Sequence, residues 1–217
     1  MSGSGRHGVA AFDFDGTLTH RDTLLPFLRR ACGERRVARA AALAAWRTRA
    51  RGRDAFKVAI LGELFRGWPA GRLEALGRAY VPGLLDGLRP QLVERLRWHQ
   101  REGHAVVLVS ASLGAYLRPL ADRLGLDGAL AVELAADADG VLTGEVRGGL
   151  NTRGPEKVAR LRAWVDAHLG TAAKVELWAY GDSSGDEALL AAADHPTRVG
   201  RRRGITWAAC ARRRLHG

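Results

Sequence analysis

Cysteine and long apolar runs are scarce in this chain of 217 residues. Its two cysteines, Cys32 and Cys210, are too few and too far apart for a disulfide framework or a zinc site. No apolar stretch approaches the roughly 20 residues that a membrane-spanning helix needs. The residues Met1–Arg6 form no hydrophobic signal region. These absences favour a cytoplasmic protein.

Lysine is also rare, because 31 of the 34 basic residues are arginines. The exceptions are Lys57, Lys157 and Lys174. Where arginine is the usual cation, a lysine can mark a position that needs a compact, strongly hydrated charge. Chance is the alternative explanation.

The net charge of +11 is distributed unevenly along the chain. Residues 20–85 hold 14 Lys and Arg against five Asp and Glu, and residues 198–217 hold seven Arg and no acid. This asymmetry predicts anionic partners near both regions, such as phosphates, anionic lipid or nucleic acid. A chain-wide preference for arginine explains the same charge equally well.

Apolar runs of strand length alternate with helical patterns over most of the chain. The runs are 9–12, 105–109, 129–134, 141–146 and 175–180, with 129–134 and 141–146 expected to pair around a turn. The alternation predicts an α/β fold, a doubly wound, Rossmann-like parallel sheet whose sites lie at the C-terminal ends of its strands. Residues 20–85 show helical patterns only. We therefore expect a core of 1–19 and 86–217 with a helical cap, 20–85, inserted after the first strand.

The first apolar run ends abruptly in two aspartates, Asp13 and Asp15, followed by Gly16 and Thr17. Two carboxylates that leave one strand toward the same loop repel each other unless a cation lies between them. A hard divalent cation such as Mg²⁺ prefers these oxygen ligands. A solvated Asp-Gly turn is the structural alternative.

Other polar residues are expected at the same edge of the sheet. Ser110 follows the run 105–109, and Asp182 and Asp186 follow the run 175–180. Lys157 falls in the first turn of a helix predicted to begin at Pro155, where its charge opposes the helix dipole. Each residue alone has a local explanation as a turn or capping residue. Together they predict one polar constellation.

This constellation resembles the four motifs of haloacid dehalogenase superfamily phosphatases. The matching residues are Asp13-x-Asp15-Gly16-Thr17, Ser110, Lys157 and Gly181-Asp182-x-x-x-Asp186. The helical insertion resembles the cap of their phosphoserine-phosphatase-like subclass, and the likeness spans about residues 9–195. It implies a Mg²⁺-dependent phosphatase that hydrolyses phosphate monoesters.

The resemblance also implies a role for each residue. Asp13 would be the nucleophile that forms an aspartyl-phosphate, and Asp15 the general acid and base. Mg²⁺ would be bound by Asp13, Asp182 and the backbone carbonyl of Asp15. Three residues would hold the phosphoryl oxygens: Thr17, Ser110 and Lys157. Asp186 would support the metal shell or Lys157, and Gly16 would let the backbone turn closely around the phosphate.

The substrate is less closely defined than the chemistry. Amino-acid phosphatases follow the motif serine with Gly-Gly, whereas here Ala111 and Ser112 follow Ser110 and alter the space for a small substrate. Three runs instead resemble the branch that contains phosphatidylglycerophosphatase C and the CicA-like phosphatases: Asp22–Leu28, Ser110–Ser112 and Asp54–Lys57.

Two further residues are candidates for substrate binding. Asp22 lies where phosphoserine phosphatases recognise the substrate amine, although a helix cap explains it as well. Lys57 can reach from the cap toward an anionic substrate group, and an exposed helix lysine is the alternative.

The expected partner is a small-molecule or lipid phosphate monoester, with peripheral contact to the inner face of an anionic membrane as a further hypothesis. A phosphoserine phosphatase and a phosphotransferase remain alternatives, because both use the same residues. A non-enzymatic protein that binds nucleic acid is less favoured, since no aromatic stacking motif or basic recognition helix is evident. The sequence does not predict the oligomeric state.

Overall fold

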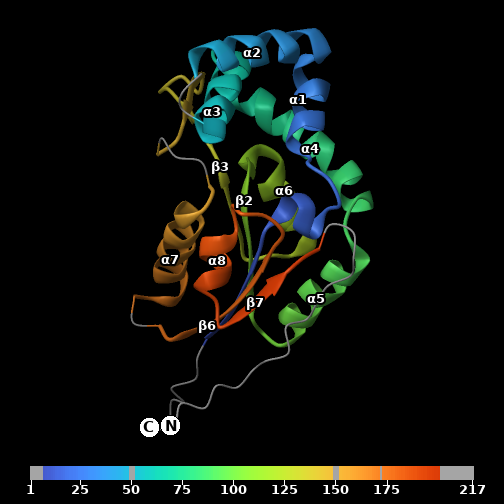
Figure 1. The fold of residues 1–217 in the computed structure, drawn as a ribbon, viewed down its shortest axis with the longest axis vertical. Helices are drawn as coiled ribbons and strands as arrows, with labels where there is room; N and C mark the ends of the chain where they lie inside the picture. Colours follow the sequence, from blue (N-terminus) through green and yellow to red (C-terminus); the bar gives the residue numbers. More distant parts are fainter. Residues whose placement is uncertain (1–6, 49–51, 149–151, 172, 201–217) are drawn as a thin grey trace.

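The computed structural model describes residues 7–48, 52–148, 152–171 and 173–200. A five-stranded parallel sheet in the order β3-β2-β1-β6-β7 forms its centre (Figure 1). The strands are β1 (His7–Phe12), β2 (Ala105–Leu113), β3 (Gly128–Val132), β6 (Val175–Gly181) and β7 (His195–Arg198). The predicted doubly wound α/β fold is confirmed.

Both faces of the sheet are covered because β1 carries apolar side chains on each side. Val9 and Ala11 pack in a cluster with α7 (Pro155–Leu169) and α8 (Glu187–Ala191). Ala10 and Phe12 belong to the cluster on the other face, with α5 (Pro90–Arg101) and α6 (Gly114–Leu124). Side chains alternate along a strand, so a run that is apolar at every position indicates burial on both faces.

The cap region consists of helices that lie beyond the C-terminal ends of the strands (Figure 1). They are α1 (Leu24–Cys32), α2 (Glu34–Arg47), α3 (Gly52–Phe65) and α4 (Ala70–Asp86). The apolar cluster of the sheet continues into them through Phe27 and Leu64. Within the described ranges, none of the helices combines the length and the apolar character that crossing a membrane requires.

The chain crosses between the sheet and these helices twice, and the two crossings lie side by side. Thr19 of the first crossing and Leu88 of the second form an antiparallel bridge. The amide of Arg89 donates to the carbonyl of Leu18 at 2.8 Å. The boundaries of the cap at 20–85 remain a prediction.

The expected pairing of 129–134 with 141–146 is wrong in its first strand. Residues Gly128–Val132 form β3, which lies parallel to β2 at the edge of the main sheet. A strand that follows a β-strand and a helix returns most readily as a parallel neighbour of that first strand. The hairpin is formed by β4 (Leu134–Ala136) and β5 (Leu142–Val146) instead.

This hairpin packs on the cap helix α3 rather than on the sheet. The amide of Gly67 donates to the carbonyl of Leu142, and the amide of Leu142 donates to the carbonyl of Trp68, both at 2.8 Å. A segment far from the cap in sequence therefore covers one side of it.

Candidate active site

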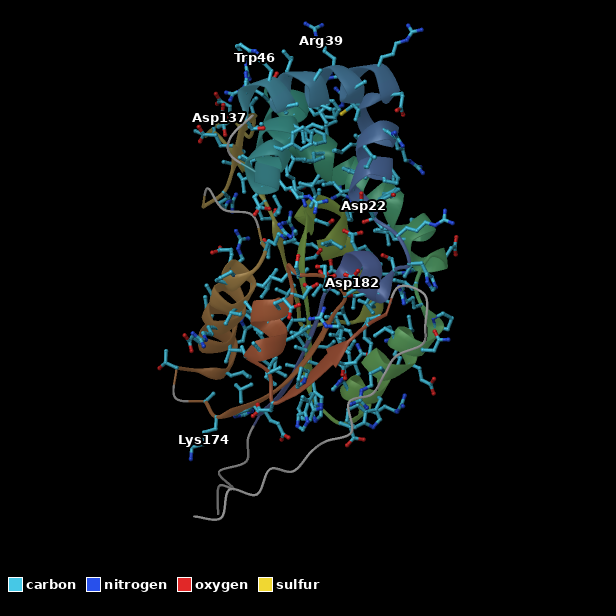
Figure 2. All side chains as sticks on the ribbon, viewed as in Figure 1. Asp22, Arg39, Trp46, Asp137, Lys174 and Asp182 are labelled. Carbon is cyan, nitrogen blue, oxygen red and sulfur yellow. The ribbon has the colours of Figure 1, made fainter. Side chains whose placement is uncertain are left out.

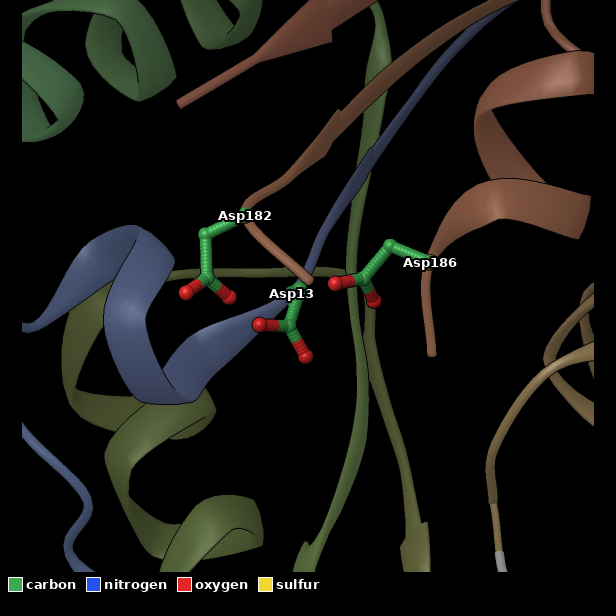
Figure 3. A group of neighbouring side chains, drawn as sticks. All are labelled: Asp13, Asp182 and Asp186. Atoms are coloured by element: carbon green, nitrogen blue, oxygen red, sulfur yellow. The ribbon is translucent and has the colours of Figure 1, made fainter. Parts of the chain in front are cut away.

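Three aspartates from two strand ends meet at the C-terminal edge of the sheet (Figure 3). Asp13 directly follows β1, Asp182 directly follows β6, and Asp186 lies at the start of α8. One carboxylate oxygen from each lies within 4.8 Å of the others. The adjacent ends of two neighbouring parallel strands bring these side chains together, in agreement with the predicted constellation.

Lys157 balances the charge of this cluster. Its Nζ donates to Oδ1 of Asp13 at 2.5 Å and to Oδ1 of Asp186 at 2.6 Å, and all three side chains are buried. Burial alone would lower the pKa of Lys157, but the two carboxylates outweigh it and raise that pKa. The lysine therefore keeps its charge inside the protein.

Asp13 and Asp186 differ in their electrostatic surroundings. Burial raises the pKa of Asp13 to about 7; Lys157 opposes this rise and Asp186 adds to it. Burial also acts to raise the pKa of Asp186, but Lys157 and Ser183 together lower it. The Oδ2 atom of Asp186 accepts from the amide of Ser183 at 3.0 Å and from its hydroxyl at 2.7 Å. Asp186 is thus a fixed anion that orients Lys157.

Asp15 points to a different set of partners. Its Oδ1 accepts from both the amide and the hydroxyl of Thr23, each at 2.7 Å, and its Oδ2 accepts from the hydroxyl of Ser112. Burial raises the pKa of Asp15, while the bonds from Ser112 and Thr23 oppose the rise. The hydroxyl of Tyr116 lies 3.2 Å from Oγ1 of Thr23. Burial raises the pKa of Tyr116 well above its usual value, so its hydroxyl stays protonated.

The loop after β1 needs its glycine and a buried arginine. Gly16 has φ of 85°, and a Cβ there would collide with the carboxylate of Asp182. The guanidinium of Arg89 donates to the carbonyl of Gly16 at 2.9 Å and to that of Thr19 at 3.2 Å. These bonds fix the path of the chain from the catalytic candidates Asp13 and Asp15 to the cap.

The predicted phosphate-binding residues surround the same edge. The Thr17 hydroxyl is buried and has no hydrogen-bond partner, a state it shares only with Thr152 among the described side chains. An unpaired buried hydroxyl is unfavourable, so a ligand oxygen would satisfy it. Ser110 is 1% exposed, and its Oγ accepts from the amide of Ser112 at 3.1 Å.

A cleft of about 320 Å³ opens between the sheet edge and the cap. Its lining unites most of the predicted residues: Asp13, Asp15, Asp22, Lys57, Ser110, Ala111, Lys157, Asp182 and Asp186. Gly16 and Thr17 are not part of this lining, since both lie buried in the loop beneath it.

The two candidates for substrate binding come from the cap side of this cleft. Lys57 of α3 donates from Nζ to the carbonyl of Ala111. Burial lowers the pKa of Lys57, and the carboxylates of Asp15, Asp22 and Asp54 oppose this effect. Asp22 is exposed and lies one residue before Thr23, the N-cap residue of α1; it accepts from the amide of Leu24 at 3.1 Å and also lines the cleft. Figure 2 shows Asp22 and Asp182 in the middle of the molecule.

The carboxylates fit a hard divalent cation. Asp13, Asp182 and Asp186 present oxygen donors close to one another, which is the ligand type that Mg²⁺ prefers. The side chain of Asp15 does not belong to this group, and a metal contact through its backbone carbonyl stays a prediction. Both carboxylate oxygens of Asp186 are engaged, Oδ1 by Lys157 and Oδ2 by Ser183, which favours Asp13 and Asp182 as the direct ligands.

Several residues of the site were not predicted. The spacing of Ser110 and Ser112 could have indicated Ser112, because residues two apart in a strand share a face. The predicted strand ended at 109, whereas β2 continues to Leu113. Both Ser110 and Ser112 line the cleft. Nothing in the spacing of the sequence indicated the others, which are Thr23, Tyr116, Arg89 and Arg153; Arg153 lines the cleft and donates to the hydroxyl of Ser184 at 3.2 Å.

Fold and site together define a parallel α/β sheet with a carboxylate cluster at its C-terminal edge. The family model for haloacid dehalogenase-like hydrolases matches residues 10–191. Protein CicA of Caulobacter vibrioides is 34% identical over 193 residues, which cover 86% of this chain and 83% of that protein. The chain belongs to the haloacid dehalogenase-like hydrolases, and the predicted membership is confirmed.

Solved structures share the fold at lower identity. A protein of unknown function from Bordetella pertussis Tohama I matches with a TM-score of 0.67 and 23% identity, covering 87% of each chain. A phospho-aspartyl intermediate analogue of phosphoserine phosphatase matches with a TM-score of 0.56 and 21% identity, covering 87% of this chain and 84% of that one. These likenesses show that the fold is shared.

Proposed function

We propose that this hydrolase is a Mg²⁺-dependent phosphatase that acts on phosphate monoesters through an aspartyl-phosphate on Asp13. The observation that carries the proposal is the contact of Asp13 with Lys157, beside Asp182 and at the mouth of a polar cleft. A phosphate dianion repels a carboxylate, so attack requires cations held next to the nucleophile. The phospho-aspartyl analogue described for a phosphatase of the same fold supports this chemistry.

The residues divide the reaction between them. Asp13 attacks phosphorus while Lys157, Ser110 and Thr17 hold the transferring oxygens. Asp15 protonates the leaving alcohol and then removes a proton from the water that hydrolyses the aspartyl-phosphate. Mg²⁺, held by Asp13, Asp182 and the carbonyl of Asp15, would neutralise phosphoryl charge. Asp186 orients Lys157 by accepting a hydrogen bond from its Nζ.

The leaving group lies toward the cap, because Lys57 of α3 lines the same cleft as Asp15. Lys57 carries its charge into this cleft, where its Nζ donates to a backbone carbonyl, that of Ala111. A cation in this position favours a leaving group that carries a second negative charge, such as a carboxylate or the phosphodiester of a phospholipid. Asp22 lines the same cleft, so an amino-acid phosphate such as phosphoserine remains the alternative substrate.

The test is phosphate release from a panel of monoesters in the presence of Mg²⁺, comparing the native protein with Asp13→Asn. We expect release by the native protein and a loss of at least about 1,000-fold in the variant, the scale seen when a nucleophile is removed. The panel should include phosphoserine, sugar phosphates, nucleotides and phosphorylated lipids. Equal release by both proteins would overturn the proposal. Adding an alcohol acceptor separates hydrolysis from phosphoryl transfer.

A peripheral contact with anionic membrane is the second proposal, and one observation favours it. The exposed large apolar side chains of the described residues all lie on α1 and α2: Leu25, Leu43 and Trp46. Trp46 is 65% exposed, and Figure 2 shows it near Arg39 at the cap end of the molecule. Exposed tryptophan with arginine suits a lipid headgroup region. Most of the basic segment 198–217 lies outside the described residues.

Vesicle co-sedimentation tests this contact. We expect binding to vesicles with anionic lipid at low salt, and weaker binding at high salt or after the double substitution Arg39→Gln and Trp46→Ala. Binding that ignores the anionic lipid content, or that the double substitution leaves unchanged, would refute it.

A further inference from the structure

Arg153 lies two residues before α7, on the core side of the cleft, and its side chain reaches the cap. Its Nη1 lies 3.9 Å from Oδ1 of Asp54 in α3, and its Nη2 donates to the hydroxyl of Ser184 at 3.2 Å. Both Arg153 and Asp54 line the cleft. The pair is thus a polar contact between core and cap, like the bond from Lys57 to the carbonyl of Ala111.

The stem of Arg153 is held against the loop that carries Asp182 and Asp186. A Cβ at Gly185 would lie 2.9 Å from Nε of Arg153 and 3.0 Å from its Cγ, so the glycine permits this close approach. The amide of Gly154 donates to the carbonyl of Gly185 at 2.8 Å, which ties the two loops together. The core therefore fixes the arginine, while its guanidinium remains at the cleft.

The contact between Arg153 and Asp54 is weak enough to be exchanged for a ligand. The two side chains are 35% and 53% exposed, and 3.9 Å is close to the longest separation at which charged groups count as an ion pair. Water screens such a pair, so it adds little stability. A substrate anion that meets the planar guanidinium in bidentate geometry is a stronger partner.

The charges of the cleft indicate what kind of anion fits there. Besides the proposed catalytic, phosphate-binding and metal-binding residues, the charged side chains of the described lining are Arg53, Lys57 and Arg153 against Asp22 and Asp54. Three cations and two carboxylates leave one positive charge. A phosphodiester or a carboxylate carries one negative charge, whereas a further phosphate monoester carries nearly twice that. The lining therefore matches a singly charged group.

Arg153 and Lys57 can contact the same group. Asp54 and Lys57 are three residues apart on α3, so their side chains are neighbours on one face of the helix. A group that takes the place of Asp54 beside the guanidinium therefore also comes close to the ammonium of Lys57.

We propose that Arg153 determines substrate specificity: its guanidinium binds a singly charged anionic group of the leaving alcohol, which displaces Asp54 and lies between Arg153 and Lys57. The proposal rests on the proposed phosphatase function and extends it from the cap to a residue of the core. Asp54 holds the guanidinium toward the cleft until the substrate binds, and then gives up its place.

Three esters built on one scaffold test this proposal. Glycerol 3-phosphate carries a neutral hydroxyl at its far carbon, 3-phosphoglycerate carries a carboxylate there, and the third ester carries a methyl phosphodiester at that position. We expect the native protein to prefer an anionic ester in kcat/KM, and the choice between the two identifies the group. Arg153→Met should reduce the preference over glycerol 3-phosphate about 10- to 30-fold, mainly through KM, the scale of one charged hydrogen bond. Arg153→Lys should restore only part of it, because an ammonium lacks the planar fork.

Asp54→Asn separates substrate binding from a structural role of the pair. The substitution removes the carboxylate that competes for the guanidinium, so kcat/KM of the preferred anionic ester should rise about two- to fivefold, the scale of an exposed ion pair. If the pair only held the cap on the core, Asp54→Asn and Arg153→Met would both lower kcat/KM. That outcome would overturn the proposal.

Arg162→Met is the matched control, because Arg162 is an exposed arginine of α7 that lines a different groove. It should keep the native preference among the esters. An unchanged preference in Arg153→Met would refute the proposal, as would a native protein that accepts other monoesters but neither anionic ester, or that prefers glycerol 3-phosphate to both. A native protein that releases phosphate from no monoester at all would instead overturn the proposed phosphatase function.

Discussion

Lys157 Nζ lies 2.5 Å from Asp13 Oδ1, although 144 residues separate the two in sequence. The same ammonium donates to Oδ1 of Asp186 at 2.6 Å, so one cation bridges two buried carboxylates and offsets the repulsion between them. This contact joins the end of the first strand to the start of α7 and places the predicted nucleophile against a fixed positive charge.

Replacing Lys157 by methionine should therefore impair both folding and catalysis. The substitution keeps the length of the side chain but leaves Asp13 and Asp186 facing each other without a cation. Breaking a buried ion pair from one side destabilises proteins by about 3–5 kcal/mol. We expect a loss of that order in urea unfolding and no measurable phosphate release. Lys174→Met, at an exposed lysine far from the site, should change neither quantity.

Replacing Lys57 by methionine should change substrate preference rather than the chemical step. For a monoester with a second anionic group, such as 3-phosphoglycerate, kcat/KM should fall about 10- to 30-fold, the worth of one charged hydrogen bond. For ethyl phosphate it should change less than threefold. Steady-state kinetics on both esters measures the difference, again with Lys174→Met beside it. A uniform loss on both esters would mean that Lys57 acts on the phosphoryl group or on the fold.

Replacing Arg89 by methionine should loosen the loop that carries Gly16. The buried guanidinium donates to the carbonyls of Gly16, Thr19 and Gly200, and each would lose a partner. We expect a destabilisation of about 2–4 kcal/mol, because unsatisfied buried acceptors are unfavourable, together with reduced kcat. Arg89→Lys should recover only part of the stability, since an ammonium cannot reproduce the planar fork. Full recovery by lysine would show that charge alone matters.

His99 should make the protein acid-sensitive. The side chain is fully buried between Tyr180 and His104, and burial lowers its pKa to about 3, aided by Arg95. The unfolded chain binds a proton near pH 6.5 while the folded protein does not, so stability should fall as pH drops from about 6.5 toward 3, by up to ~1.4 kcal/mol per unit.

Urea unfolding of His99→Gln between pH 7.5 and 5 measures this effect. The variant should lose stability at pH 7.5 but show a flatter decline below pH 6.5. His168→Gln, at an exposed position on α7, should decline as steeply as the native protein. An unchanged slope in His99→Gln would assign the acid sensitivity to other groups.

The sheet and the carboxylates could be predicted because their signals are local. Val9–Phe12 is apolar at every position, which only burial on both faces explains, and Asp13 interrupts the run at its end. The order of strands and helices then places Ser110, Asp182 and Lys157 at the same edge. Each of these steps uses sequence spacing of a few residues together with the general geometry of parallel sheets.

The remaining features depend on contacts between distant segments. Residues 128–132 are equally compatible with a hairpin and with an edge strand, and only the space beside β2 decides between them. Thr23 resembles any residue before a helix, and Tyr116 any residue of an apolar helix face. Their meeting around Asp15 depends on how α1 and α6 pack, which has no counterpart in the spacing of the sequence. Arg89 is indistinguishable from the many other arginines until the loop it supports is in place.

The bridge between Thr19 and Leu88 means that the cap leaves and rejoins the sheet at a single place. A segment whose two ends are neighbours can be lengthened, shortened or exchanged without parting the strands that flank it. The cap can therefore diverge as one module, while the carboxylate cluster remains anchored to an unaltered sheet. If the predicted cap selects the substrate, transplanting residues 20–85 between relatives should transfer substrate choice with it.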